Sequence, residues 1–290
     1  MSAHERCQAG ANSDFRLTQC TLNVVPFPLP TPLCFMTTSS CGTLALALAL
    51  LTGCGPNPAA DTATTTPAAT APAAAPASGS GAAVENPGEA CAVQVAGITF
   101  TRSLNGAAQN AKVDQGTLTL RSAAKRDYFN DPDGKLTNNT APVLLTKVDN
   151  RQPFTLTAKV TPSFLDMYDA GVLYLFVRND WWQKFCFERD ERARTRVVSV
   201  RTIGTSDDND HDLITRKAVY MKISSDTKTV GFYHSLDGTT WELARLYKND
   251  YPADIWLGLS TQSPIGKGTT AQFEECTLTK TSIKDFRLGI

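Results

Sequence analysis

From residue 91 to residue 290 the chain alternates apolar and polar residues with a period of two. Phe154, Leu156, Ala158 and Val160 alternate with Thr and Lys at the intervening positions. Successive side chains of a β-strand point to opposite faces, so this pattern predicts a strand with one buried face. Helical periodicity is nearly absent from the same region, which indicates an all-β fold.

Further strands are predicted between clusters of Gly, Asp, Asn and Pro, which favour turns. Asp237-Gly238 predicts a hairpin turn before Trp241, because Gly accepts the positive φ that such turns need. Strands this numerous, with no helices between them, indicate a β-sandwich or a barrel. The predicted strands are residues 98–102, 116–121, 154–161, 171–178, 182–189, 195–203, 217–223, 230–236, 255–261 and 271–279.

Residues 1–53 are expected to be a leader for export. Leu44–Leu51 is an unbroken apolar run that is too short to span a bilayer but suits a signal peptide. The tetrad Leu51-Thr52-Gly53-Cys54 resembles the lipobox of bacterial lipoproteins, which implies lipidation of Cys54. If translation starts at Met36, no Lys or Arg precedes the apolar run, whereas a start at Met1 gives an unusually long leader.

Residues 54–90 are expected to form a disordered linker behind the lipid. The stretch is rich in Ala, Thr and Pro and has almost no large apolar residue to offset the entropy of ordering it. An acyl chain on Cys54 would tether the domain of residues 91–290 to a membrane. We therefore expect an exported, lipid-anchored protein of the bacterial cell envelope, on its periplasmic or cell-surface face.

Charge and cysteine content limit the partners and the cross-links. The chain has 28 Lys and Arg against 28 Asp and Glu, so no net field favours nucleic acid. We expect no nucleic-acid partner, and we expect a monomer. Cys91 and Cys276 lie near the two ends of the predicted domain and are a candidate disulfide, since the terminal strands of a sandwich are often neighbours. The alternative is that both thiols are free and that Cys186 is a small buried apolar residue.

The strand at residues 181–189 carries the strongest indication of a binding surface. Phe185 and Phe187 share the face that is expected in the core, whereas the other face carries an aromatic ring and two charges. An aromatic ring beside charged groups suits a sugar, which stacks its apolar ring face and bonds through its hydroxyls. The alternative is a solvated face with a cross-strand ion pair. The residues of this second face are Trp182, Lys184, Cys186 and Glu188.

Residues 207–212 form an acidic segment, Asp-Asp-Asn-Asp-His-Asp, which is expected to be a loop. Oxygen ligands of this kind hold hard cations, so Ca²⁺ is a possible ligand, although the Gly and Glu of an EF-hand are missing. The alternatives are a rim that grips a ligand and a plain solvated loop.

Several short motifs occur in an order that resembles one known family. Together they resemble the bacterial "regulation of enolase" proteins of unknown function, within the concanavalin A-like lectin and glucanase superfamily, over residues 95–281. The resemblance implies a jelly-roll sandwich of two antiparallel sheets and, by superfamily analogy alone, a carbohydrate ligand. The motifs include Tyr128-Phe129-Asn130-Asp131-Pro132-Asp133-Gly134, Tyr168-Asp169-Ala170-Gly171, Lys184-Phe185-Cys186-Phe187-Glu188, Ser206-Asp207-Asp208 and Gln262-Ser263-Pro264.

A binding module is favoured over an enzyme. Glucanases of the superfamily place two or three carboxylates at alternating positions of one strand, with nucleophile and acid about 5 Å apart. Glu188 is instead preceded on its face by Lys184, beside which we expect it to keep its charge. The alternatives are a glycosidase that uses Glu188 and a structural or protein-interaction lipoprotein. The residues expected around the ligand are Tyr168, Asp169, Trp182, Lys184, Glu188, Asp207, Asp208 and Gln262.

Overall fold

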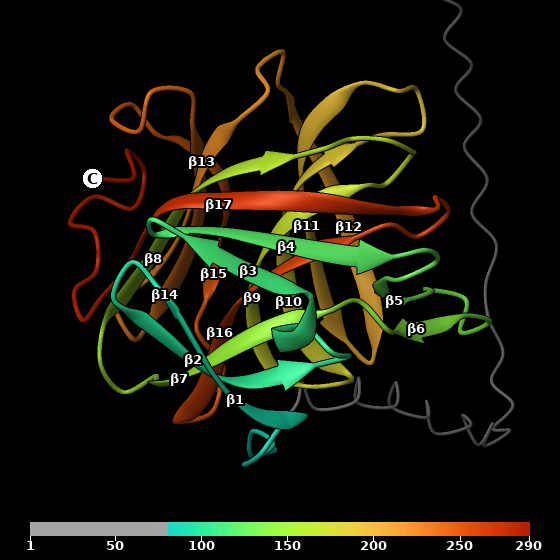
Figure 1. Ribbon diagram of the computed structural model, residues 1–290. Coiled ribbons are helices and arrows are strands. Elements are labelled where there is room, and N and C mark those ends of the chain that lie inside the picture. Colours follow the sequence, from blue (N-terminus) through green and yellow to red (C-terminus); the bar gives the residue numbers. More distant parts are fainter. Residues whose placement is uncertain (1–80) are drawn as a thin grey trace, which may run out of the picture. The chain divides into compact units, whose positions relative to one another are not determined.

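The computed structural model describes residues 81–290, which form two antiparallel sheets and a separate two-stranded hairpin (Figure 1). The first sheet has eight strands in the order β1 (Glu89–Val95), β2 (Ile98–Leu104), β7 (Val143–Asp149), β16 (Asp254–Gln262), β9 (Ala170–Arg178), β10 (Trp181–Arg189), β11 (Thr195–Ile203) and β12 (Thr205–Leu213).

The second sheet has seven strands, and the hairpin has two. The order of the second sheet is β15 (Glu242–Lys248), β14 (Thr229–Ser235), β13 (Val219–Ser225), β8 (Phe154–Pro162), β17 (Gly268–Thr279), β4 (Thr117–Ala123) and β3 (Ala111–Asp114). The hairpin consists of β5 (Tyr128–Asn130) and β6 (Thr137–Asn139), and a 3-10 turn, η1 (Ala108–Asn110), precedes β3.

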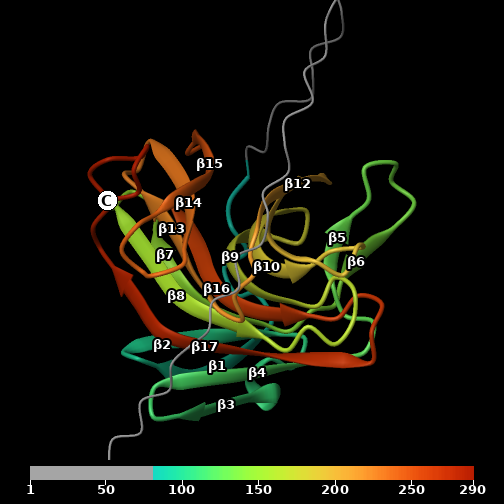
Figure 2. The ribbon, with the colours of Figure 1, turned by 90° about the horizontal axis from the view of Figure 1, so that it is seen from above.

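The two sheets, seen from above in Figure 2, contribute to one apolar core. Phe154, Leu156, Ala158 and Val160 of β8 are buried, and the residues between them are half-buried. The ring of Phe185 in the first sheet packs on that of Phe232 in the second, with 5.1 Å between centroids. Burying a large apolar side chain of this kind contributes about 1.5–3 kcal/mol. The predicted all-β, jelly-roll sandwich of antiparallel sheets is confirmed.

Each strand predicted from the alternation is present, within a few residues of its predicted bounds. The predicted turn at Asp237-Gly238 joins β14 to β15, and Gly238 has a φ of 77°. The expectation of an acidic loop at residues 207–212 is wrong, because these residues belong to β12 and pair with β11. β12 is the edge strand of its sheet, and most of its side chains are exposed.

The folded region begins before residue 91. β1 starts at Glu89, and the backbone N–H of Val84 donates to the carbonyl of Val177 at 3.0 Å. The indole Nε1 of Trp256 donates to the carbonyl of Val84, also at 3.0 Å. The end of the predicted linker is therefore part of the domain. The predicted leader, the lipidation site at Cys54 and most of the predicted linker lie outside the described residues.

The expected disulfide between Cys91 and Cys276 is not formed, and both thiols are free. Cys91 lies on β1, at the edge of the eight-stranded sheet, and its Sγ donates to the carbonyl of Phe100 at 3.3 Å. Cys276 is buried on β17, within the other sheet. The two terminal strands thus belong to different sheets and do not pair. Cys186 is a buried free thiol, as the alternative held.

Candidate functional site

The outer face of the eight-stranded sheet, which points away from the core, is partly covered by the β5–β6 hairpin. The Tyr128 ring from β5 packs edge-on against the rings of Trp182, Tyr174 and Phe176, with centroids 5.8, 5.9 and 6.4 Å away. Trp182 is fully buried as a result. The prediction that Trp182 presents its ring to a ligand is therefore wrong, although its place on the outer face is as predicted.

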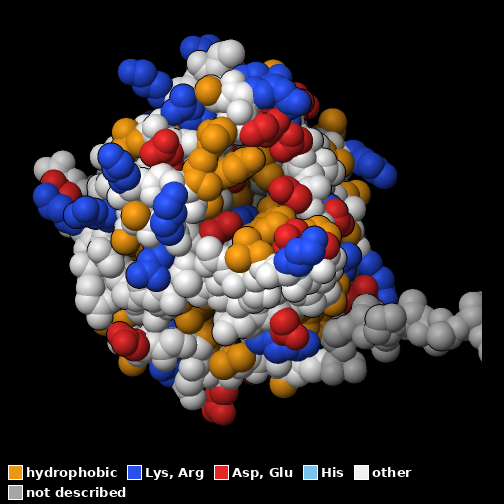
Figure 3. All heavy atoms as spheres, turned by 90° about the vertical axis from the view of Figure 1, so that its right-hand side faces the viewer, with side chains coloured by type: hydrophobic (Ala, Val, Ile, Leu, Met, Phe, Trp, Pro, Cys, Tyr) orange, Lys and Arg blue, Asp and Glu red, His pale blue; other side chains and the backbone are white. Residues whose placement is uncertain are grey.

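Beside this hairpin the outer face is hollowed, and Figure 3 shows hydrophobic and acidic side chains around the hollow. A cavity of about 270 Å³ opens here, which we call the acidic pocket. Its polar walls come from β10, β12, β16 and the segments that flank β5 and β9. It is lined by Asp127, Phe129, Tyr168, Lys184, Glu188, Val198, Val200, Asp208, Gln262 and Pro264.

Lys184 lies at the floor of the acidic pocket and is only 3% exposed. Its ammonium donates to Asp127 Oδ1 at 3.1 Å, to the Tyr128 carbonyl at 2.8 Å and to Gln262 Oε1 at 3.1 Å. These bonds use all three ammonium protons. Burial lowers the pKa of Lys184, but the neighbouring acidic groups, chiefly the Asp127 carboxylate, together outweigh it and the pKa is raised. Lys184 is thus a fixed, charged part of the floor.

Glu188 lies on the same strand and the same face, two residues beyond Cys186, and is also buried. Its Oε2 accepts from Gln262 Nε2 at 3.2 Å, and Gln262 Nε2 also donates to the Tyr168 carbonyl at 3.2 Å. Burial raises the pKa of Glu188 well above its usual range, and Lys184 offsets this only in part. This shift favours the protonated carboxyl, contrary to the expectation that a neighbouring Lys keeps it charged.

Two adjacent carboxylates of β12 face opposite ways. Asp208 is opposite Val200 of β11, which in turn is opposite Lys184, so it lies on the outer face and lines the acidic pocket. Desolvation raises the pKa of Asp208, and Lys184 lowers it. Asp207 points to the other side, where its Oδ2 lies 3.3 Å from Arg245 Nη2. The prediction of a binding role for Asp207 is therefore not supported by its position.

Asp169 and Tyr168 lie at the loop before β9 but have different roles. Asp169 is buried, and its Oδ2 accepts from the backbone N–H groups of Leu165 and Asp166 at 2.9 Å each. It therefore holds the loop in shape and is absent from the pocket lining. Tyr168 is half-buried and lines the pocket. Of the predicted ligand residues, the structure brings together Tyr168, Lys184, Glu188, Asp208 and Gln262.

The sequence did not identify Asp127 and Phe129 as site residues. Asp127 Oδ1 accepts from the Tyr128 backbone N–H at 2.8 Å as well as from Lys184, and its carbonyl accepts from Thr140 and Ala141. It therefore joins the hairpin to the floor of the pocket. The only sequence signal was that Phe129 lies within the first motif of the family resemblance.

The expectation of a possible Ca²⁺ site has no support in the described part of the chain. Among residues 81–290, no three side chains of Asp, Glu, His or Cys are grouped so that they could hold a metal ion. The exposed residues of β12 alternate between two faces, which separates the carboxylates that a loop would have gathered. Across the same residues there is also no helix long and apolar enough to cross a membrane.

The fold is similar to that of several solved structures. A functionally unknown protein from Saccharomyces cerevisiae is 21% identical, with a TM-score of 0.57 over 61% of this chain and 95% of that chain. A mutant of the GH43 protein BlXynB from Bacillus licheniformis is 14% identical, with a TM-score of 0.49, covering 63% of this chain and 36% of that one. A xyloglucan GH43B protein from Bacteroides ovatus is also 14% identical, with a TM-score of 0.48 over the same shares.

At the level of sequence, no curated protein matches the chain. A family match extends over residues 104–281, more than half of the chain, and includes the hairpin, the seven-stranded sheet, six strands of the eight-stranded sheet and every residue of the acidic pocket. The description of that family gives no support to the name "regulation of enolase". The chain belongs to the family described as "Protein of unknown function (DUF1349)".

Proposed function

We propose that this protein is a non-catalytic module that binds a saccharide unit in the acidic pocket. The observation that carries the proposal is the floor of the pocket, where Lys184, Asp127, Gln262 and Glu188 hold one another in a single hydrogen-bonded network. A buried polar network whose members are satisfied is rigid and positions its remaining groups before a ligand arrives. Rigid polar groups favour a ligand with many hydroxyls in fixed positions.

The groups at the mouth of the pocket match the two kinds of surface that a sugar offers. Asp208 supplies carboxylate oxygens that accept from hydroxyls, and Glu188, whose raised pKa favours the protonated carboxyl, supplies a donor. Phe129 is half-buried at the wall, so part of its ring faces the cavity and suits the apolar face of a sugar. The volume of about 270 Å³ lies just below the range typical of drug-sized ligands and suits one sugar ring.

The same proposal includes export and anchoring. The lipobox-like tetrad at Leu51–Cys54 and the Ala, Thr and Pro composition that follows it support a lipid on Cys54 and a linker that leads to the domain. Expression in a bacterial host tests this part on its own. We expect the protein in the membrane fraction and the Cys54→Ala variant in the soluble fraction, and equal fractionation of the two would contradict anchoring.

A glycan array with the purified protein tests the binding function. We expect a restricted set of saccharides to bind and Phe129→Ala to weaken this binding by up to about tenfold, since a stacked aromatic ring contributes about 0.5–1.5 kcal/mol beyond its buried area. Leu136→Ala is the matched control, because Leu136 is an exposed apolar residue of the same hairpin and does not line the pocket. No bound saccharide on the array, or equal loss in both variants, contradicts the proposal.

A glycosidase is the second candidate, and one observation favours it. Glu188 has the raised pKa of a general acid, and Asp127 and Asp208 line the same cavity. We favour a binding module over an enzyme because the Asp127 carboxylate forms an ion pair with Lys184 and is therefore not free to act as a nucleophile. Incubation with aryl glycosides tests the enzyme: turnover that is abolished in Glu188→Gln would establish it and overturn the non-catalytic role.

A further inference from the structure

The β5–β6 hairpin divides the outer face of the eight-stranded sheet, and a second cavity lies on the other side of it. This cavity has a volume of about 600 Å³, within the range of small-molecule sites. We call it the asparagine pocket. It is lined by Val84, Asn86, Pro87, Gly88, Leu104, Asn130, Thr137, Asn139, Phe176, Arg178, Asn179, Asp180 and Gly204.

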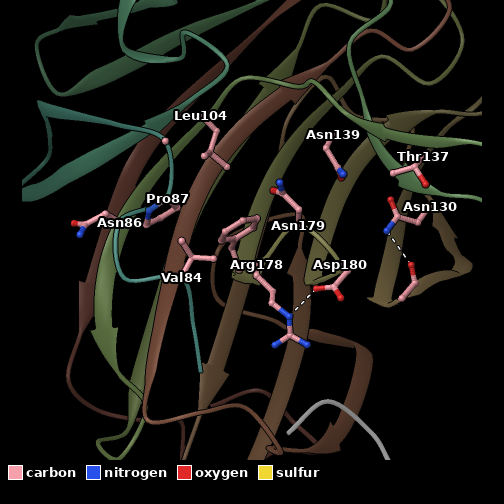
Figure 4. Close-up of a pocket in the computed structure, with 13 residues that line it drawn as sticks. Val84, Asn86, Pro87, Leu104, Asn130, Thr137, Asn139, Arg178, Asn179 and Asp180 are labelled. Atoms are coloured by element: carbon pink, nitrogen blue, oxygen red, sulfur yellow. Dashed lines mark hydrogen bonds and ion pairs between the residues drawn. The ribbon is translucent and has the colours of Figure 1, made fainter. Parts of the chain in front are cut away.

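Three segments that are distant in sequence form its walls (Figure 4). Val84 and Pro87 of the N-terminal segment lie on one side, and Asn130 and Asn139 of the hairpin lie on the other. Asn179, from the turn between β9 and β10, lies between them. The buried side chains of Phe176 and Leu104 give the pocket an apolar floor.

The lining is polar without carrying net charge. Arg178 is paired with Asp180, with 2.7 Å between Nε and Oδ1, and the other polar side chains are four amides and one hydroxyl. This differs from the acidic pocket, where carboxyl groups outnumber the single ammonium. An amide has both donors and acceptors, so a cluster of amides favours a neutral ligand that has both as well.

Several polar atoms of this lining lack partners within the described residues. Asn130 is 5% exposed, and its Nδ2 donates to the Gly204 carbonyl at 2.9 Å, but its Oδ1 has no partner among residues 81–290. The same is true of Asn139 Oδ1 and Arg178 Nη1. A buried polar atom without a partner costs about 1–3 kcal/mol. The pocket thus has two acceptors and one donor that a ligand with complementary groups would satisfy.

The N-terminal wall of the pocket is held firmly in place. Gly88 has a φ of 61°, and a Cβ at this position would lie 2.3 Å from the carbonyl oxygen of Ser103. Only glycine allows this close approach of the segment to β2. Val84 fixes the other end through its bonds to Val177 and Trp256. The cavity is therefore formed before a ligand binds.

We propose that the asparagine pocket binds a neutral saccharide unit, at a second site separate from the acidic pocket. Hydroxyls of the sugar would donate to Asn130 and Asn139 Oδ1 and accept from Arg178 Nη1, while its apolar face lies toward Phe176. The proposal goes beyond the function assigned to the acidic pocket, because different residues and different unsatisfied atoms carry it. A saccharide can occupy either pocket alone.

Nuclear magnetic resonance on the isotope-labelled protein tests this site directly, because Asn side-chain amides give their own signals. The probes are neutral gluco-, xylo- and manno-oligosaccharides of four to six units. We expect at least one of them to shift the amide signals of Asn139 and Asn179 in a saturable manner. The double variant Asn139→Ala/Asn179→Ala, followed through the side-chain amides of Asn86 and Asn130, which also line the pocket, should weaken that binding about tenfold or more, the equivalent of about 1.4 kcal/mol.

Two variants serve as controls. Asn209→Ala removes an exposed amide of β12 outside both pockets, and Asp208→Asn alters only the acidic pocket. Both should leave the shifts of Asn139 and Asn179 unchanged. The inference is overturned if no probe shifts these amides, or if Asp208→Asn abolishes every shift. Shifts confined to the acidic pocket would overturn this second site and leave the proposed function intact.

Discussion

The two faces of strand β10 are buried to a similar extent by different means. On the inner face, Phe185 and Phe187 belong to the apolar core, where Phe185 packs on Phe232 of the second sheet and Phe187 on Phe164 of the loop before β9. On the outer face, Trp182 is covered by a two-stranded hairpin, and Lys184 is enclosed by a polar network. Alternation along a strand thus shows which residues share a face, whereas the segments that cover that face are distant in the sequence.

The inner face should tolerate truncation least. Phe185→Ala is expected to lower the free energy of unfolding by about 3–5 kcal/mol, because it leaves a cavity among residues that cannot collapse into it. Chemical denaturation measures the loss, and Phe129→Ala, at the half-buried wall of the acidic pocket, is the comparison. Equal losses for the two variants would mean that the sandwich interior is no more closely packed than the pocket wall.

On the outer face, removal of the buried ammonium should cost somewhat less. Lys184→Met is expected to lower the free energy of unfolding by about 3 kcal/mol, since it leaves the Asp127 carboxylate and Gln262 without their donor. Adding Asp127→Asn should restore part of the loss, because the remaining group is then uncharged. A double-mutant cycle measures this coupling. Strict additivity of the two changes would show that the ion pair does not organise the outer face.

The raised pKa of Glu188 predicts a dependence of stability on pH. Its pKa is raised in the folded protein, so the folded state holds this proton at pH values where the unfolded chain has lost it. Stability should therefore fall as pH rises above about 4.5, by about 1.4 kcal/mol for each unit by which the pKa is raised. Glu188→Gln needs no proton and should lose this slope.

Denaturation of the protein at a series of pH values between 4 and 8 makes the measurement. Glu89→Gln is the control, because Glu89 is exposed at the edge strand β1 and should leave the slope unchanged. A slope that is identical in the protein and in Glu188→Gln would show that Glu188 is charged in the folded state.

The smallest effect is expected at the exposed ion pair of β12. Asp207 is 69% exposed where it meets Arg245, and surface pairs of this kind contribute between zero and about 1 kcal/mol. Asp207→Asn should therefore change the free energy of unfolding by less than about 0.5 kcal/mol and leave ligand binding intact. A larger loss would mean that this edge strand depends on the pair for its place in the sheet.

The sequence was sufficient for the parts of the fold that bury one face against the core. β8 and β10 have strong alternation, and their bounds and inner faces are as predicted. β12 was missed because an edge strand exposed on both faces has no apolar period, and its row of acidic residues is equally typical of a loop. The strands β5 and β6 were missed because three residues are too few to show a period.

The candidate site was predicted only in part, because alternation identifies residues of long strands but not their partners from distant segments. Lys184, Glu188 and Gln262 lie on long strands; parity and the family resemblance pointed to Lys184 and Glu188, and the resemblance to Gln262. The partner of Lys184 is Asp127, 57 positions earlier in the chain, and only the fold brings the two together. The burial of Trp182 has the same cause, because the Tyr128 ring that covers it comes from the hairpin. Neither contact can be predicted from the residues that neighbour it in the sequence.

The central claim is that the acidic pocket binds a saccharide through the outer face of β12. Calorimetric titration with the saccharide that binds most strongly on the array tests it most directly, with Asp208→Asn and Asp207→Asn compared side by side. These neighbours point to opposite faces of β12. We expect about a tenfold loss of affinity for Asp208→Asn and no change for Asp207→Asn. Equal affinities for both variants and the unaltered protein would contradict the account.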